Sequence, residues 1–225
     1  MLAGEAVVAI WNGIEPKGRK EFYEWHIREH MPERVGTPGF RRGRRYCALD
    51  TKTRPEYFTL YEVDTFQVLQ GRDYTDRLND PTEWTRRATA HFQNTSRALA
   101  RVLASFGHGP GGTLLTIRFD VAAARAQEVR TKLTRNLLEI AELPQITGAH
   151  LCRADSDVSV VRTEESRTRT DIEVPPTWFV LVEACTVAAL DRVEDSLRGL
   201  LPAEGVIHGR YSCEYTRLKT SASAG

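Results

Sequence analysis

Apolar and polar residues follow one another along the chain in two successive series of similar organisation. In the first series, short apolar runs rich in β-branched and aromatic residues predict strands, and apolar residues three and four apart predict helices. The predicted strands are residues 6–11, 40–49, 56–63 and 96–106. The predicted helices are residues 17–35, 66–71, 73–79 and 82–92. Residues 96–106 also suit a helix, and we prefer a strand because it completes the order described below.

A stretch of glycine and proline around residues 107–112 separates the two series and has the composition of a linker. After it, the predicted strands are residues 113–119, 146–153, 177–184 and 207–218. The predicted helices are residues 122–143 and 186–200. Residues 155–174 are polar and charged, and we expect a mobile loop there rather than a binding element.

Each series has the order β-α-β-β-α-β, which predicts a ferredoxin-like unit with helices on one face of an antiparallel sheet. The bare faces of two such sheets can cover each other and close a barrel with the helices outside. We therefore predict an α+β fold of two tandem units paired into an α+β barrel. The units are residues 1–107 and 113–220, joined by a linker at 108–112 and followed by a disordered tail at 221–225.

The composition limits the partners and the location. The chain is 41% hydrophobic and 27% charged with a formal net charge of +1, so it offers no global attraction to nucleic acid or an anionic membrane. No apolar run approaches the roughly 20 residues that span a bilayer, and the N-terminus lacks the features of a signal peptide. Four cysteines lie in strand-like runs outside any CxxC pair: Cys47, Cys152, Cys185 and Cys213. We expect free thiols in a cytoplasmic protein.

Most of the candidate chemistry lies in the predicted helix 17–35, which holds two of the six histidines. Because each helical residue advances by about 100°, His26 and His30 share one face. That face also carries Phe22, Tyr23 and Glu33, with Trp25 and Glu29 at its borders. Burial on such a face would keep both imidazoles near or below neutral pKa unless a carboxylate raises them, which suits a general base.

Three interpretations of this face remain open. In the first, His30 with His26, and with Glu29 beside them, forms an acid/base site next to a pocket for a small apolar substrate. In the second, the spacing His26-x-x-Glu29-His30 holds a divalent metal ion, in the order of the inverted zincin motif. A third ligand would then come from elsewhere: Glu33, His91 or Glu62. In the third, the histidines only join the helix to the sheet. We assign the first, with no metal and no cofactor.

The strand 56–63 alternates hydroxyl-bearing and apolar residues. We assign Phe58 and Leu60 to the side that faces the helices. The hydroxyl-bearing residues would then face the barrel interior: Tyr57, Thr59 and Tyr61. Trp11 is a possible neighbour, and an interior lined in this way could hold an aromatic or acyl ligand. The alternative is an interior packed solid with side chains.

The strand 40–49 carries a dense basic run: Arg41, Arg42, Arg44 and Arg45. Alternation sends some of these guanidinium groups inward, where one could bind a substrate carboxylate bidentately. The alternative is a surface ladder paired with Glu56 or Glu62. The predicted substrate-binding residues are Trp11, Tyr23, Arg44, Tyr46 and Tyr61.

The chain resembles the dimeric α+β barrel superfamily, and residues 6–106 are most similar to its EthD-like members. The resemblance lies in Trp25-His26-Ile27-Arg28-Glu29-His30-Met31-Pro32, in the turn Pro38-Gly39-Phe40 and in the strand Tyr57-Phe58-Thr59-Leu60-Tyr61-Glu62. It implies that His30 is the matching histidine. The second half is similar only in its order of elements, and its helix 122–143 has no histidine.

The superfamily includes cofactor-free monooxygenases, small isomerases and haem-dependent enzymes, so the resemblance implies a fold more strongly than a reaction. The first hypothesis is an oxidoreductase- or isomerase-type enzyme of the EthD-like barrel type, acting on an aromatic or acyl compound with a histidine base. The second is a non-catalytic ligand-binding or stress-associated barrel, and the third is a metal- or haem-dependent enzyme. For haem, the isolated histidines are His150 and His208. A homodimer is left open.

Overall fold

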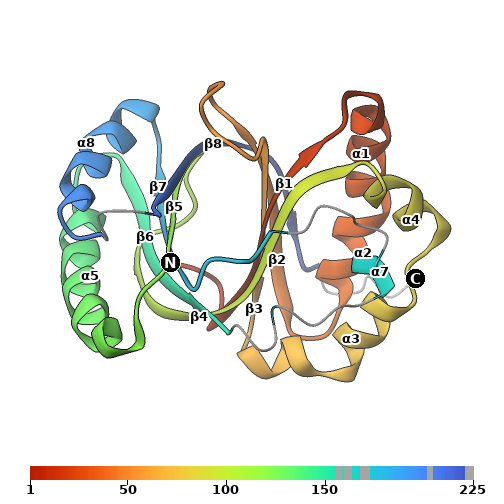
Figure 1. Cartoon of the computed structure of the whole chain (residues 1–225), viewed down its shortest axis with the longest axis horizontal. Coiled ribbons are helices and arrows are strands. Elements are labelled where there is room, and N and C mark those ends of the chain that lie inside the picture. Colours follow the sequence, from red (N-terminus) through yellow and green to blue (C-terminus); the bar gives the residue numbers. More distant parts are fainter. Residues whose placement is uncertain (156–158, 160–163, 168–172, 202–204, 221–225) are drawn as a thin grey trace.

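The computed structural model describes residues 1–155, 159, 164–167, 173–201 and 205–220. Within these residues the strands form a closed barrel in the order β1-β3-β2-β8-β5-β7-β6-β4. The barrel stands between two layers of helices, with α5 and α8 on one side and α1 to α4 on the other (Figure 1). The predicted disordered tail, residues 221–225, lies outside the described residues, as do parts of the predicted loop 155–174.

The first unit contains a continuous helical stretch between its first two strands. Its strands are β1 (Ala6–Ile14), β2 (Phe40–Ala48), β3 (Tyr57–Val63) and β4 (Phe92–Gly107). Its helices are η1 (Pro16–Gly18), α1 (Arg19–Trp25), η2 (His26–His30), α2 (Met31–Gly36), η3 (Phe66–Gln70), α3 (Arg72–Asn79) and α4 (Glu83–Thr89). The stretch ends at Gly36, and the next turn uses Gly39 at φ 81°, a conformation that favours glycine.

The second unit repeats this order of elements. Its strands are β5 (Thr113–Phe119), β6 (Ile146–Ala154), β7 (Trp178–Ala184) and β8 (Ile207–Leu218). Its helices are η4 (Ala123–Arg125), α5 (Ala126–Ala141), α7 (Glu164–Arg167) and α8 (Val187–Arg198). None of the described helices is long and apolar enough to cross a membrane.

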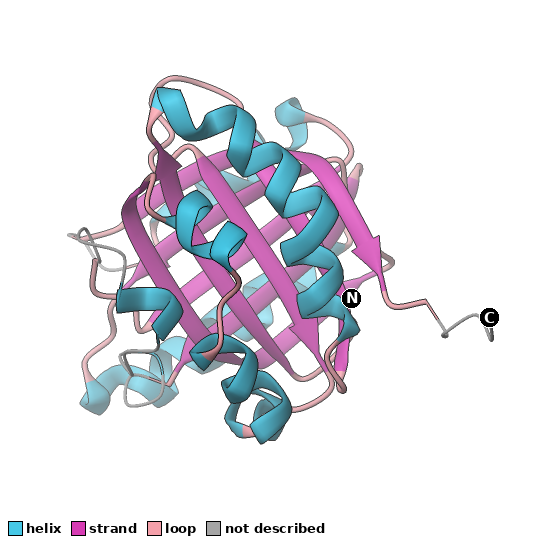
Figure 2. Ribbon diagram, turned by 90° about the vertical axis from the view of Figure 1, so that its right-hand side faces the viewer, coloured by secondary structure: helices cyan, strands magenta, loops and turns pink. Residues whose placement is uncertain are grey.

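Two long strands close the barrel within one chain. β4 pairs with β1 through residues 92–101 and with β6 through residues 100–107. β8 pairs with β5 through residues 207–212 and with β2 through residues 211–218. Figure 2 shows the strands of the far sheet crossing behind those of the near sheet, with helices lying across the front. The predicted α+β barrel of two β-α-β-β-α-β units is therefore confirmed.

The side chains of β3 face the opposite way from the prediction. Phe58 and Leu60 lie inside the barrel, where Phe58 packs against Trp11 at a ring distance of 4.9 Å. Tyr61 faces the helices and packs with Met31 and Phe40. The alternation of the strand was correct, but a strand with large side chains on both faces does not indicate which face is inside.

Two other predictions need correction in the described residues. The helix predicted for residues 82–92 ends at Thr89, and β4 starts at Phe92. In the stretch predicted as a mobile loop, residues 155–174, Ser159 and Glu165 are buried. The Ser159 hydroxyl accepts the backbone N–H of Leu99, so this stretch covers part of β4.

Candidate active site between the first helix and the sheet

The histidine-bearing segment contains a π-helical turn, η2, in which the N–H of Met31 donates to the carbonyl of His26. Such turns insert one extra residue and often occur at functional sites. Here the turn keeps both imidazoles on the buried side of the helix, with 3% of His26 and 5% of His30 exposed. Their ring centroids lie 5.6 Å apart and the ring planes are inclined by 32°. The sequence did not predict the π turn.

Aromatic side chains surround the two imidazoles. The His30 ring lies 4.3 Å from the Trp25 ring and 6.3 Å from the Tyr61 ring. The His26 ring lies 5.3 Å from the ring of Phe22. The indole N–H of Trp25 donates to the hydroxyl of Thr85 over 3.1 Å, which fixes this wall against α4. The rings therefore form an apolar enclosure around two polar groups.

Burial keeps His26 uncharged. Desolvation lowers the pKa of His26 well below its ordinary value of 6.5, and the neighbouring His30 and Arg45 act in the same direction. Its Nδ1 atom is buried and has no hydrogen-bond partner in the described part of the chain. A neutral imidazole with an unused ring nitrogen is a competent proton acceptor.

The side chains between the first helix and the sheet form a layer, which includes His26 and His30. One end of this layer holds a guanidinium group among aromatic rings. Arg45 projects from β2 with its Cζ 4.4 Å from the Tyr23 ring centroid and 5.6 Å from that of Phe22. Its Nε donates to Glu214 over 3.1 Å, and the Tyr23 hydroxyl donates to the same carboxylate over 2.9 Å. Its Nη1 is buried and lacks a partner among the described residues. Arg45 and His26 both pack against the ring of Phe22, so Arg45 presents a free donor beside His26.

The other end of the layer is also polar. Arg34 on α2 pairs with the buried carboxylate of Glu165, and its guanidinium lies 6.0 Å from the Tyr74 ring. Burial alone would lower the pKa of Arg34, but the carboxylates, Glu165 first, raise it above its ordinary value. The Tyr61 hydroxyl is buried without a partner in the described residues. Burial raises the pKa of Tyr61, so its hydroxyl stays protonated and can donate.

The layer between the first helix and the sheet is unusual in its number of unsatisfied polar atoms. Four such atoms of the described residues belong to it: His26 Nδ1, Arg45 Nη1, Tyr61 Oη and Thr95 Oγ1. The corresponding layer of the second unit contains a large cluster of apolar side chains, among them Leu133, Leu137, Ile140, Val180 and Val182. Buried polar groups without partners are rare in native proteins and need an explanation.

The predicted site residues divide into three places. His26, His30 and Tyr61 come together in this layer, with Tyr23 at its edge. Trp11, Arg44 and Tyr46 are inside the barrel, on the other face of the sheet. Glu29 points toward α4, where it accepts hydrogen bonds from the hydroxyls of Thr82 (2.5 Å) and Thr85 (3.1 Å).

We expect Glu29 to stabilise the start of α4, because Thr82 caps that helix by accepting the N–H of Thr85. Glu29→Gln should lower the free energy of unfolding by about 1 kcal/mol and leave ligand binding in the layer unchanged. Urea unfolding and a ligand titration of the same variant test this. A loss of ligand binding at unchanged stability would instead support the predicted role of Glu29 beside the histidines.

Arg44 and Tyr46 belong to a buried ionic network at the linker end of the barrel. Arg44 donates to Glu183 from two nitrogens over 2.5 and 3.0 Å and to Glu62 over 3.1 Å. His150 lies between Glu183 and the Ser105 hydroxyl, at 3.3 and 2.9 Å. The ring of Tyr46 lies 5.6 Å from the Arg44 guanidinium. Arg44 is therefore occupied by internal carboxylates.

The residues considered for a metal or haem are dispersed in the structure. Of the possible third ligands, Glu62 pairs with Arg42 and Arg44 inside the barrel, and His91 contacts Glu15 at 3.0 Å. Glu33 pairs with Arg34 and Arg77. The described residues include no cluster of three or more potential metal ligands. His150 is in the ionic network, and His208 contacts Glu194 beside α8.

Arg34 and Arg45 also lie in this layer, but they were not among the predicted site residues. The basic run drew attention to Arg44, but Arg45 has the opposite parity and faces the helices. The signal was present, because Arg45 and Thr59 are register partners and lie on one face with Tyr57 and Tyr61. Arg34 lies one helical turn after His30, and only its partner Glu165, distant in sequence, marks it as buried.

The neutral state of His26 predicts acid sensitivity. Its folded pKa lies below the unfolded value of 6.5, so the unfolded chain binds a proton that the folded chain does not. Stability is therefore fully present above about pH 6.5 and is lost as the pH falls below it. We expect His26→Asn to reduce this loss by up to about 1.4 kcal/mol per pH unit. Urea unfolding of both proteins at about pH 7.5 and 5 measures this difference. An equal loss of stability between the two pH values in the wild type and in His26→Asn would contradict the prediction. His150, whose pKa burial also lowers, contributes equally in both proteins.

Comparisons with known proteins identify the fold. An anthrone oxidase-like protein superimposes with a TM-score of 0.67 at 11% identity, over 97% of this chain and 95% of that one. A proposed monooxygenase from Lactobacillus acidophilus gives 0.56 at 9% identity, over 96% of each chain. Another from Fusobacterium nucleatum gives 0.54 at 9%, over 97% and 96%. The chain has the ferredoxin-like α+β barrel fold. No protein-family model matches it, and no curated protein sequence does either. At these identities the similarity concerns the fold alone.

Proposed function

We propose that this protein is a cofactor-free, small-molecule oxidoreductase of the EthD-like barrel type. Its substrate is an aromatic or acyl compound bound between the first helix and the sheet. A neutral imidazole of the pair His26 and His30 is the general base. The four unsatisfied polar atoms of this layer are the observation that supports the proposal most strongly.

The first unit buries polar groups between its helices and the sheet, where the second unit has an apolar cluster. An unsatisfied buried polar group costs about 1–3 kcal/mol, so four in one layer oppose folding considerably. In the second unit a cluster of aliphatic side chains lies between the helices and the sheet. A bound molecule that offers oxygen atoms to Arg45 and Tyr61 would offset the cost in the first unit. The polar layer therefore favours a ligand site over a merely structural contact.

An anthrone is the probe substrate that we propose for this layer. It is a planar ketone whose methylene group between two aryl rings loses a proton to a base, giving an enolate. Nδ1 of His26 would accept that proton, and Nη1 of Arg45 would donate to the enolate oxygen. The enolate adds dioxygen at carbon, and the resulting hydroperoxide loses water. Anthrone and dioxygen thus give anthraquinone and one water molecule. The similarity in fold to an anthrone oxidase-like protein supports this choice of probe.

The test is an oxygen-electrode assay with anthrone as the probe. We expect the protein to accelerate dioxygen uptake over buffer, with one anthraquinone formed per dioxygen consumed. Treatment of the protein with a chelator should leave the rate unchanged. A rate that disappears with the chelator and returns with a divalent ion would favour the metal-dependent alternative.

The non-catalytic alternative makes a different prediction. A ligand-binding barrel would bind anthraquinone without accelerating anthrone oxidation. Histidines saturated by internal carboxylates would indicate such a protein, but Nδ1 of His26 has no carboxylate partner in the described residues. The catalytic proposal is the better supported of the two for that reason.

A further inference from the structure

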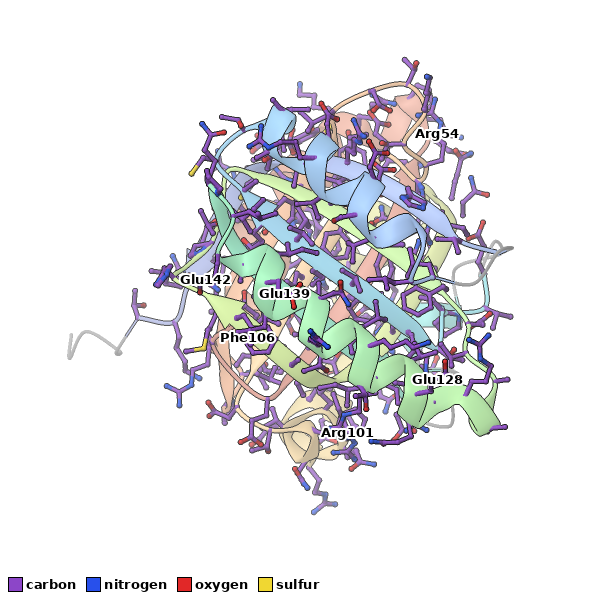
Figure 3. The ribbon with its side chains drawn as sticks, turned by 90° about the vertical axis from the view of Figure 1, so that its left-hand side faces the viewer. Arg54, Arg101, Phe106, Glu128, Glu139 and Glu142 are labelled. Atoms are coloured by element: carbon purple, nitrogen blue, oxygen red, sulfur yellow. The ribbon has the colours of Figure 1, made fainter. Side chains whose placement is uncertain are left out.

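A second feature lies at the barrel end formed by the hairpin between β2 and β3. A cavity of about 580 Å³ opens there, a size typical of small-molecule sites. Its wall combines apolar and polar residues, among them Ile14, Pro16, Leu49, Arg54 and Pro55. Figure 3 shows Arg54 at this end of the molecule, with Arg101 at the opposite end. The histidine pair does not line the cavity.

Arg118 lies directly behind this wall. It projects from β5 and is 5% exposed, with its guanidinium 5.0 Å from the Trp11 ring. Its Nη2 donates to the carbonyl of Arg54 over 3.1 Å, and the neighbouring Tyr211 hydroxyl donates to the carbonyl of Pro55 over 3.0 Å. The backbone of residues 54 and 55 therefore separates the cavity from the buried guanidinium.

Arg118 differs from the other buried arginines of the described chain. Arg34, Arg44 and Arg45 each form an ion pair with at least one carboxylate. Arg118 forms none in the described residues, and its Nε is buried without a hydrogen-bond partner there. Burial lowers the pKa of Arg118, and the opposing influence of Tyr211 and Glu173 does not compensate. An uncompensated buried cation is costly, which points to an anion from outside.

Arg42 shows what the missing partner would be. At the other end of the barrel its Nε and Nη2 bind the two oxygens of Glu62 over 2.8 and 2.7 Å. This is the edge by which guanidinium holds a carboxylate bidentately. The same edge of Arg118 is half occupied, by a carbonyl that belongs to the cavity wall. Ser96, whose register partner is Trp11, adds a second buried oxygen without a partner in the described residues.

We propose that this barrel end is a second ligand site, which binds a small organic carboxylate. The Arg54 carbonyl moves aside, and the carboxylate takes the Nε and Nη2 edge of Arg118 that this carbonyl now half occupies. The apolar body of the ligand occupies the cavity against Ile14, Leu49 and Pro16. The site is separate from the histidine layer and does not depend on the proposed oxidation.

Calorimetric titration with benzoate, and with benzamide as its uncharged match, tests this site. We expect benzoate to bind the wild-type protein at least about tenfold more tightly than benzamide, the value of one charge-assisted contact. Arg118→Met should lose that preference. The matched control is Arg153→Met, because Arg153 also stacks on a tryptophan, Trp178, but is exposed. That control should bind benzoate as the wild type does.

A spectrum of protein labelled with ¹⁵N-arginine covers the case in which Arg118→Met does not fold. Benzoate should shift the buried Nε resonance that the Arg118→Lys variant lacks. Equal binding of benzoate and benzamide, retained binding in Arg118→Met, or an unmoved Arg118 resonance would each overturn the proposal. If chloride bound as tightly as benzoate and displaced it, the proposal that the site prefers an organic carboxylate would be overturned. Anthrone oxidation in Arg118→Met should match the wild type, so the two proposals fail independently.

Discussion

Arg44→Met should lower the free energy of unfolding by about 3–5 kcal/mol, as expected when one partner of a buried ion pair is removed. Arg44 is 1% exposed and lies between the carboxylates of Glu62 and Glu183. Glu62 would keep Arg42, but among the described residues Glu183 would keep only His150 and the N–H of Gly111. The sequence predicted Arg44 as a substrate ligand, and the structure instead favours a large loss of stability.

Urea unfolding measures this loss, and Arg101→Met is the matched control. Arg101 stacks on Phe66 at 4.0 Å but is exposed, so its replacement should change stability by less than about 0.5 kcal/mol. A loss below about 1 kcal/mol in Arg44→Met would show that the network is not a structural requirement.

The same network makes the stability of the protein depend on pH in the acid range. Burial alone would raise the pKa of Glu183, but hydrogen bonds and charges of His150 and Arg44 hold it at about 2. Its folded pKa lies below the unfolded value of 4.5, so its contribution is complete above that pH and is lost as the pH falls toward 2. In Arg44→Met the folded pKa of Glu183 should rise toward 4.5, so this loss of stability on acidification should become smaller.

His26→Asn should reduce the turnover of anthrone by about 10²–10⁴, the usual contribution of a general base. The reason is that Asn provides no group that accepts a proton from carbon. Because burial depresses the pKa of His26, the wild-type rate should stay constant as the pH falls through 6.5 and decline only below it. Initial rates of dioxygen uptake across this range measure both effects.

His91→Asn is the control, since His91 is also in the first unit but contacts Glu15 outside the layer. It should leave turnover within about twofold, since it removes no contact of the reacting groups. The sequence favoured His30 as the base, so His30→Asn belongs in the same series. A larger rate loss in His30→Asn than in His26→Asn would assign the base to His30. Unchanged turnover in both would refute an imidazole base.

The order of elements could be predicted from the sequence because each depends on local pattern. The alternation of side chains along β3 was predicted correctly, but the face that lies inside the barrel was not. Phe58 and Tyr61, on opposite faces, are both large and both buried, so size gives no indication. The pairing of Trp11 with Phe58 on the inside depends on register between distant strands. Information of that kind is not contained in a local pattern.

The histidine pair could be predicted and most of its surroundings could not. His26 and His30 share a face on any helix, and the π turn preserves this. Arg45 lies in this layer because alternation along β2 turns its side chain toward the helices. Arg34 is buried there through its pairing with Glu165, which is more than a hundred residues away in sequence. Glu29 was assigned to the histidines by proximity in sequence, whereas its partners Thr82 and Thr85 lie on α4.

A crystal structure of the protein with anthraquinone, the product of the proposed reaction, tests the central claim most directly. We predict that its rings lie between the first helix and the sheet, with one carbonyl oxygen within hydrogen-bond distance of Arg45 Nη1 and the ring carbons facing His26. Anthraquinone found only at the barrel end beside Arg54, or no binding at all, would contradict the claim that the polar layer of the first unit is the active site.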